Sequence, residues 1–192
     1  MKNMKQLLWA LFGIVCFVQV GVIASQIISY ERVLKEGEVF YFKVLPLDPY
    51  DPFRGRYVTL RFENAIKAPL GDGEKKEDQH KGYAILEHSE KGDSIKEIRL
   101  SKPQSGSFLE VDIRSFNYTA TKQKEETSNL VYFSLPFDRF YMREDIAPKA
   151  EKVLRARSGV NVKAKLRVRE GKGVIEDLMV EQTPLSQYVL TQ

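Results

Sequence analysis

The chain has 192 residues, 43% of them hydrophobic and 29% charged, a composition typical of a folded domain rather than a disordered segment. The formal net charge is +4. Lys2 and Lys5 stand before an apolar stretch, so the 28 basic and 26 acidic residues after them leave only +2 for the rest of the chain. This near balance, without a stripe of Arg and Lys interleaved with aromatic residues, excludes nucleic acid as an expected partner.

The apolar stretch at residues 7–28 predicts a membrane helix. At 1.5 Å per residue it would span roughly 33 Å, which is enough for the hydrocarbon core of a bilayer. Lys2 and Lys5 favour a cytoplasmic tail at residues 1–6, a single pass through the inner membrane and a periplasmic or other extracytoplasmic remainder. The alternative is a signal peptide cleaved after residues 22–24, but its apolar region would be longer than that of a usual signal peptide, which has about 7–15 residues.

The segment after the membrane helix is expected to be a neck at residues 29–37, helical up to residue 36 and ended by Gly37, followed by a domain at 38–192. The single cysteine, Cys16, lies in the apolar stretch, so the domain has no intramolecular disulfide and depends on its core. We interpret Cys16 as a small hydrophobic side chain.

The domain begins with a predicted strand at residues 38–45, followed by a connection with two Asp-Pro pairs, at Asp48 and Asp51. Each proline fixes φ at about −65° and keeps the preceding residue out of the helical region, so the connection is a stiff turn. Gly55 supplies the backbone freedom to leave it. Residues 56–63 then alternate between apolar and polar side chains, which predicts a strand antiparallel to the first.

The sequence GRYVTLRF contains Gly55, Tyr57 and Leu60 at the spacing of a known pattern, after the approach DPYDPFRG. Two later stretches, residues 132–144 and the closing hairpin at 160–180, agree as well. Through these residues the extracytoplasmic part of the chain resembles the GDYXXLXY domain family.

The resemblance implies a bacterial protein with one N-terminal membrane helix and no assigned activity. Relatives are often encoded beside multi-pass membrane proteins, which implies a partner of that kind. Two positions depart from the pattern: Arg56 stands where it has Asp, and Phe62 where it has its final Tyr. The chain therefore lacks a carboxylate at residue 56.

The rest of the chain favours more strands and one helix. Residues 64–82 are expected to form a solvated loop, whose acidic residues lack the spacing of a calcium loop. Strands are predicted at 82–87, 94–100, 107–116, 130–137, and in a hairpin over 160–181; a helix is predicted at 143–157. Seven to nine strands and one soluble helix indicate an α+β, mainly antiparallel β, single domain behind one N-terminal transmembrane helix.

The best candidates for chemistry are the carboxylates of Asp48 and Asp51, which could divide acid and base duties. Arg54 and Arg56 would lower both pKa values and favour ion pairing, so turn stabilisation is the preferred interpretation and a cation site an alternative. His80 and His88, the only histidines, are interpreted as solvent-exposed. We predict no catalytic residue, no metal and no cofactor.

A second cluster has five aromatic residues within ten positions. Packing of these side chains in the core is the preferred interpretation, and an aromatic-lined groove is the alternative. These are Tyr132, Phe133, Phe137, Phe140 and Tyr141, with Arg139, Arg143 and Glu144 at the rim of such a groove. If the connection at 46–57 folds against this segment, Tyr50, Phe53 and Arg54 would lie beside Tyr141.

The sequence predicts a non-enzymatic, membrane-anchored domain that binds an envelope or integral membrane protein. The alternatives are an envelope hydrolase that uses Asp48 or Asp51, and a sensor of a small ligand. The residues predicted to form the motif and the partner surface are Asp48, Asp51, Arg54, Gly55, Arg56, Tyr57, Leu60, Tyr132, Tyr141 and Glu144.

Overall fold

The structure is a computed structural model of the whole chain. It describes residues 2–47, 57–63, 65–74, 79–89, 92–119, 128–142, 146, 149–150 and 161–191.

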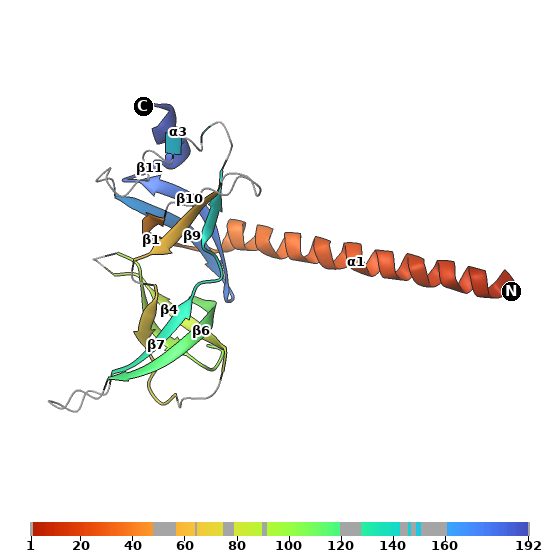
Figure 1. Cartoon of the computed structure of the whole chain (residues 1–192), viewed down its shortest axis with the longest axis horizontal. Coiled ribbons are helices and arrows are strands. Elements are labelled where there is room, and N and C mark those ends of the chain that lie inside the picture. Colours follow the sequence, from red (N-terminus) through yellow and green to blue (C-terminus); the bar gives the residue numbers. More distant parts are fainter. Residues whose placement is uncertain are drawn as a thin grey trace.

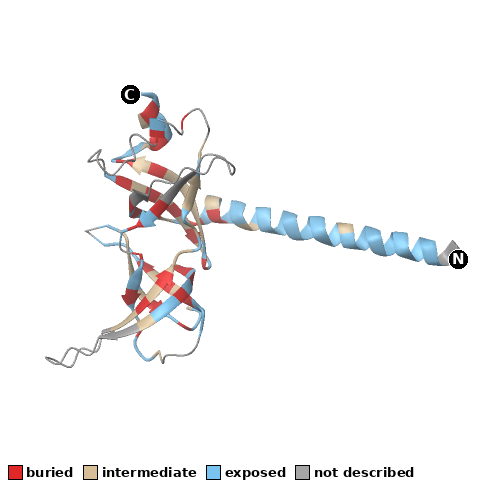
Figure 2. Cartoon of the chain, in the orientation of Figure 1, coloured by how far each residue is buried: buried red, intermediate tan, exposed pale blue. Residues whose placement is uncertain are grey.

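Helix α1 (Lys2–Glu36) is one continuous helix that projects from the rest of the molecule (Figure 1). Its apolar side chains are exposed all around from Met4 to Ile28, as Figure 2 shows, which is the pattern of a helix that needs an apolar surrounding. By length and composition it is a candidate membrane span. The expected neck is part of the same helix.

The first sheet contains, within the described residues, six antiparallel strands in the order β11-β10-β9-β1-β2-β8. Its elements are β1 (Glu38–Leu47), β2 (Tyr57–Phe62), β8 (Arg139–Tyr141), β9 (Val162–Arg169), β10 (Lys172–Val180), β11 (Thr183–Pro184) and the following helix α3 (Leu185–Leu190). The predicted pairing of β1 with β2 is confirmed, with Val44 opposite Phe62.

The second sheet contains five antiparallel strands of the described chain in the order β3-β7-β6-β4-β5. They are β3 (Lys67–Pro69), β4 (Lys81–Glu87), β5 (Ser94–Arg99), β6 (Phe108–Thr119) and β7 (Ser128–Ser134). Figure 1 shows this sheet below the first, on the same side of α1.

Both sheets contribute to one cluster of buried apolar side chains (Figure 2). The alternation predicted for β9 is regular, with Leu166 and Val168 buried and Lys165 and Arg167 half-buried. The sheets also meet through the backbone, because the amide of Glu110 on β6 donates a hydrogen bond to the carbonyl of Gly171, at 2.8 Å. The mainly antiparallel β prediction is confirmed.

Three expectations need correction or lie partly outside the description. Residues 64–82 are not only a solvated loop, because β3 pairs with β7 and Ala68 is buried there. The described strands number eleven rather than seven to nine, since strands of two or three residues leave no periodic signal. Of the helix predicted at 143–157, only residues 146 and 149–150 are described; the last two are helical, and Ile146 and Ala150 are buried.

The hairpin of β9 and β10 is confirmed, and its turn is short. Lys172 pairs with Arg169, so the loop has two residues, Glu170 and Gly171. Both have positive φ, 51° and 86°, as the type I′ turn that matches strand twist requires. The glycine at the second position makes this conformation easy to reach.

Candidate functional site

The described motif residues Tyr57 and Leu60 lie on β2, next to the edge strand β8 of the first sheet. Tyr57 opens β2 and pairs with Tyr141 of β8, so two segments 84 positions apart in sequence are neighbours in the sheet. Leu60 is buried, with 4% of its surface exposed, and belongs to the core. Tyr132 lies elsewhere, on β7 in the second sheet, opposite Lys67 and Ser115. The structure therefore brings Tyr57 and Tyr141 together, without Tyr132.

Six of the predicted site residues lie outside the described residues: Asp48, Asp51, Arg54, Gly55, Arg56 and Glu144. Tyr50, Phe53 and Arg143 lie outside them too. Their place beside Tyr141, the roles considered for the two carboxylates, and the partner surface remain predictions.

A groove of about 750 Å³ runs between β8, the turn of the β9–β10 hairpin and the C-terminal part of α1. Apolar and aromatic side chains form much of its wall, and charged ones stand beside them. The lining residues are Tyr30, Lys81, Glu110, Asp112, Pro136, Phe137, Arg139, Phe140, Tyr141, Gly171, Lys172, Gly173, Val174 and Ile175. An aromatic groove with Arg139 in its wall was the alternative interpretation of the aromatic cluster.

Gly173 lines the groove on β10 at a position with no room for a side chain. A Cβ at this residue would lie 2.5 Å from Cδ2 of Leu109 and 2.8 Å from Cε1 of Phe137, closer than real contacts allow. Only glycine lets Phe137 pack edge-on against Phe62, with ring centroids 5.7 Å apart, and still touch the β10 backbone. At Gly173 and Phe137 the groove wall is thus part of the packed core.

Most of the charged side chains in the groove form an ion pair or a hydrogen bond with a neighbouring residue. Lys81 and Glu110 form an ion pair at 2.5 Å, and the hydrogen bond from the lysine raises its pKa. Lys172 donates to the hydroxyl of Ser29 on α1 at 2.6 Å and lies 5.8 Å from the centre of the Tyr30 ring. Tyr141 remains 61% exposed at the mouth. The site offers an exposed aromatic ring next to a charged rim, which suits recognition of a surface.

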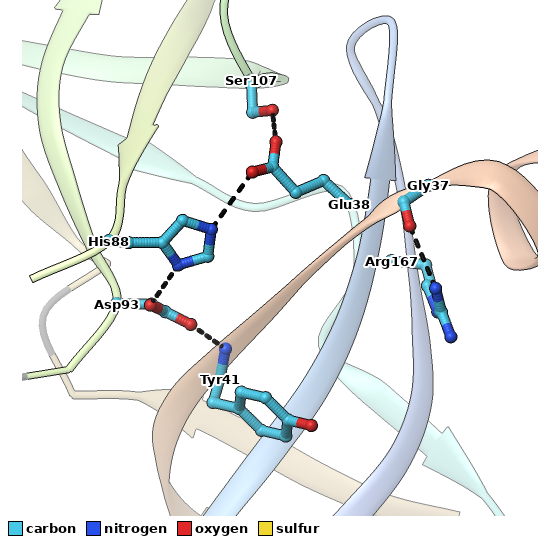
Figure 3. A network of polar contacts seen from close by, with 7 residues as sticks. All are labelled: Gly37, Glu38, Tyr41, His88, Asp93, Ser107 and Arg167. Carbon is cyan, nitrogen blue, oxygen red and sulfur yellow. Dashed lines mark hydrogen bonds and ion pairs between the residues drawn. The ribbon is translucent and has the colours of Figure 1, made fainter.

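A second polar cluster joins the two sheets around His88 (Figure 3). Nδ1 of His88 lies 2.7 Å from Oδ1 of Asp93, and Nε2 lies 3.2 Å from Oε1 of Glu38 on β1. The other oxygen of Asp93 accepts the amide of Tyr41, and the hydroxyl of Ser107 donates to Glu38. The imidazole stacks on Phe40 at 4.4 Å. His88 is exposed, as predicted, and each of its ring nitrogens contacts a carboxylate.

The electrostatics of this cluster are those of a stabilised ion pair. The hydrogen bond to Asp93, and then that to Glu38, raise the pKa of His88. The hydrogen bond from Ser107, helped by His88, lowers the pKa of Glu38 in spite of partial burial. Ser107 is bonded to the carboxylate and not to the imidazole, so this set lacks the nucleophile–base contact of a Ser–His–Asp triad. Its arrangement suits a structural link between the sheets.

A third cluster holds the end of α1. The amide of Gly37 donates to the carbonyl of Val33 at 2.9 Å, and Nη1 of Arg167 donates to the carbonyl of Gly37 at 3.1 Å. Glu176, the extra residue of a bulge in β10, accepts from Arg167 at 2.6 Å and from Lys165 at 2.7 Å. Burial opposes the charge of Glu176, but these two cations lower its pKa.

Metal ligation is not supported in the part of the chain that the structure describes, where no group of three or more His, Cys, Asp and Glu side chains could hold an ion. The sequence interpretation missed the contribution of α1 and of the hairpin to the groove. The turn at Glu170 and Gly171 could be predicted from the sequence, but the turn residues do not indicate which other residues the turn contacts.

Comparison with known proteins gives one match. A family model described as GDYXXLXY protein matches residues 19–178, from within α1 to β10. No curated protein and no solved structure matches the chain.

Proposed function

Because this chain belongs to the GDYXXLXY protein family, we propose that it is a non-enzymatic, membrane-anchored extracytoplasmic domain that binds an integral membrane protein of the envelope. The observation that carries the proposal is that the groove is lined jointly by Tyr30 of α1 and by the segment from Phe137 to Tyr141. A groove that includes the anchor helix opens where a partner in the same bilayer would present its surface.

The chemistry of the groove favours a protein surface as the occupant. Two phenylalanines and an exposed tyrosine, Phe137, Phe140 and Tyr141, offer the aromatic anchors that dominate binding energy at interfaces. Lys81, Arg139 and Asp112 stand beside them and can set the orientation of a charged or polar rim. The partner's complementary feature would be an apolar side chain that enters beside Val174, next to polar groups that reach the rim.

Site-directed photo-crosslinking in native membranes tests the proposal. A benzophenone amino acid replaces Tyr141, in the groove, or Ser186, an exposed residue of α3, which follows β11 at the edge of the first sheet opposite β8. We expect Tyr141 to give a discrete crosslink to an integral membrane protein and Ser186 to give none. Val174→Arg, which fills the groove with a cation, should abolish the crosslink, whereas Leu190→Arg, at an exposed position of α3, should leave it.

Two results would overturn the proposal. One is the same set of products from both labelled positions, which would indicate random collision. The other is a Tyr141 product that persists unchanged in Val174→Arg, because the groove would then not be the contact.

A further inference from the structure

The turn of the β9–β10 hairpin lies along α1 and leaves a hollow between them. This hollow has a volume of about 350 Å³ and is separate from the groove, although Lys172 borders both. Its wall consists of Ser25, Ile28, Ser29, Arg32, Val33, Arg169, Glu170 and Lys172. The side chains of α1 therefore face those of the turn over more than two helical turns.

The wall of the hollow carries three cations and one carboxylate. Arg169 is satisfied by Glu36 at 3.1 Å and by Glu170 at 3.4 Å. Among the described residues, the partners of Lys172 are the neutral side chains of Ser29 and Tyr30, and no carboxylate forms an ion pair with Arg32. Two positive charges thus border the hollow without an ion-pair partner in the described part of the chain.

The position of the hollow along α1 relates it to the bilayer. Residues 7–28 make 22 residues of helix without a charged side chain, and at 1.5 Å per residue they span roughly 33 Å, about the thickness of a hydrocarbon core. Arg32 is four residues, or about 6 Å, beyond residue 28. The headgroup layer of one leaflet is about 5–7 Å thick, so Ser29 and Arg32 lie within it.

We propose that this hollow binds the phosphodiester of a glycerophospholipid of the membrane, with Arg32 and Lys172 as the cations and Ile28 against the glycerol and first acyl carbons. The inference rests on the anchoring of α1 that the proposed function requires, and it does not depend on the partner.

Native mass spectrometry of the full chain, released from a phosphate-free detergent, tests the site by titration with phosphatidylglycerol and with a diacylglycerol of the same acyl chains. We expect the first to bind and the second not to bind. Each cation near a membrane surface raises the affinity for an anionic lipid roughly five-fold, so Arg32→Gln with Lys172→Gln should weaken phosphatidylglycerol binding by about 30-fold. Lys35→Gln with Lys102→Gln removes the same charge away from the hollow and should change binding less than two-fold.

A second variant protects the test against a disturbed junction. Arg32→Glu alone should weaken binding more than five-fold with an unchanged melting temperature, since none of the described residues forms an ion pair with Arg32. Equal lipid retention by the wild type and both Arg32 variants would overturn the inference. So would displacement of the lipid by millimolar inorganic phosphate, which would assign the site to a free anion.

Flotation with vesicles separates the two proposals. A chain that does not float with vesicles of any composition refutes the anchoring in the proposed function. A chain that floats while its Arg32 variants keep their lipid refutes only the phosphodiester site.

Discussion

Substitution of Gly37 by alanine should weaken the joint between α1 and the domain. Gly37 is the single residue between the helix and β1. A Cβ there would lie 2.3 Å from the carbonyl oxygen of Val33, and 3.1 and 3.2 Å from the backbone nitrogen and oxygen of Val168. All three atoms belong to the backbone, so no side chain can rotate away, and the helix end and β9 must separate.

The magnitude follows from what this separation costs. Overpacking of this kind costs about 1–3 kcal/mol. Separation would also stretch the bonds from Gly37 to Val33 and from Arg167 to Gly37, each of which contributes about 0.5–1.5 kcal/mol. We therefore expect a total loss of about 2–6 kcal/mol, which for a chain of this size lowers the melting temperature by roughly 4–24 °C.

Thermal unfolding of the full chain in detergent, followed by near-ultraviolet circular dichroism, measures this loss. Gly21→Ala is the matched control, because its added Cβ meets nothing within 4 Å and lies in the same helix. A melting temperature of Gly37→Ala equal to that of the control would refute the reasoning that the joint is closely packed.

Three further predictions concern charged groups. His88→Gln should remove a pH-dependent part of the stability: the raised folded pKa of His88 stabilises the protein below pH 6.5, and this is lost as pH rises through the folded value. The lowered pKa of Glu38 contributes stability above pH 4.5, so the free energy of unfolding of the wild type should exceed that of the variant most between pH 4.5 and 6.5. Urea unfolding measures this difference, and a constant difference from pH 5 to 8 would contradict the prediction. Glu176→Gln should cost about 1–3 kcal/mol at pH 7, and because its folded pKa is lowered, the cost should shrink as pH falls below 4.5, with Glu181→Gln, at an exposed turn, as a silent control. Asp48→Asn and Asp51→Asn should each lower the melting temperature by roughly 1–8 °C if they hold the Asp-Pro turn at about 0.5–2 kcal/mol each, whereas a stable variant that loses a hydrolytic activity would favour the enzyme alternative.

The sequence predicts the regular elements of this protein well because they follow from local periodicity. The alternation in β6 and β9, the polar turn at Glu170 and the unbroken apolar stretch of α1 each determine an element without reference to the rest of the chain. Strand β3 escapes prediction because it has three residues beside a highly charged segment, and α3 because its six residues have no N-cap side chain.

The candidate site could be predicted only in part, since its two halves come from distant segments. The aromatic cluster around Phe137 and Tyr141 is visible in the sequence, but nothing local indicates that Tyr30 and Gly173 complete a groove with it. His88 was interpreted as a solvated side chain because its partner Glu38 is 50 positions away and meets it only through packing of the two sheets. Contacts of this kind depend on tertiary structure, which local propensity and the spacing of residues in the sequence do not reveal.

The direct passage from α1 into β1 through Gly37 limits how far the domain can travel. A flexible tether would let it search a hemisphere of several nanometres, whereas a helix fastened by Arg167 and Lys172 holds it at one height. With α1 in a bilayer, the domain can meet other proteins only by lateral diffusion and by spinning about the membrane normal. Targets whose contact surface stands higher above the lipid would stay out of reach however well they matched the groove.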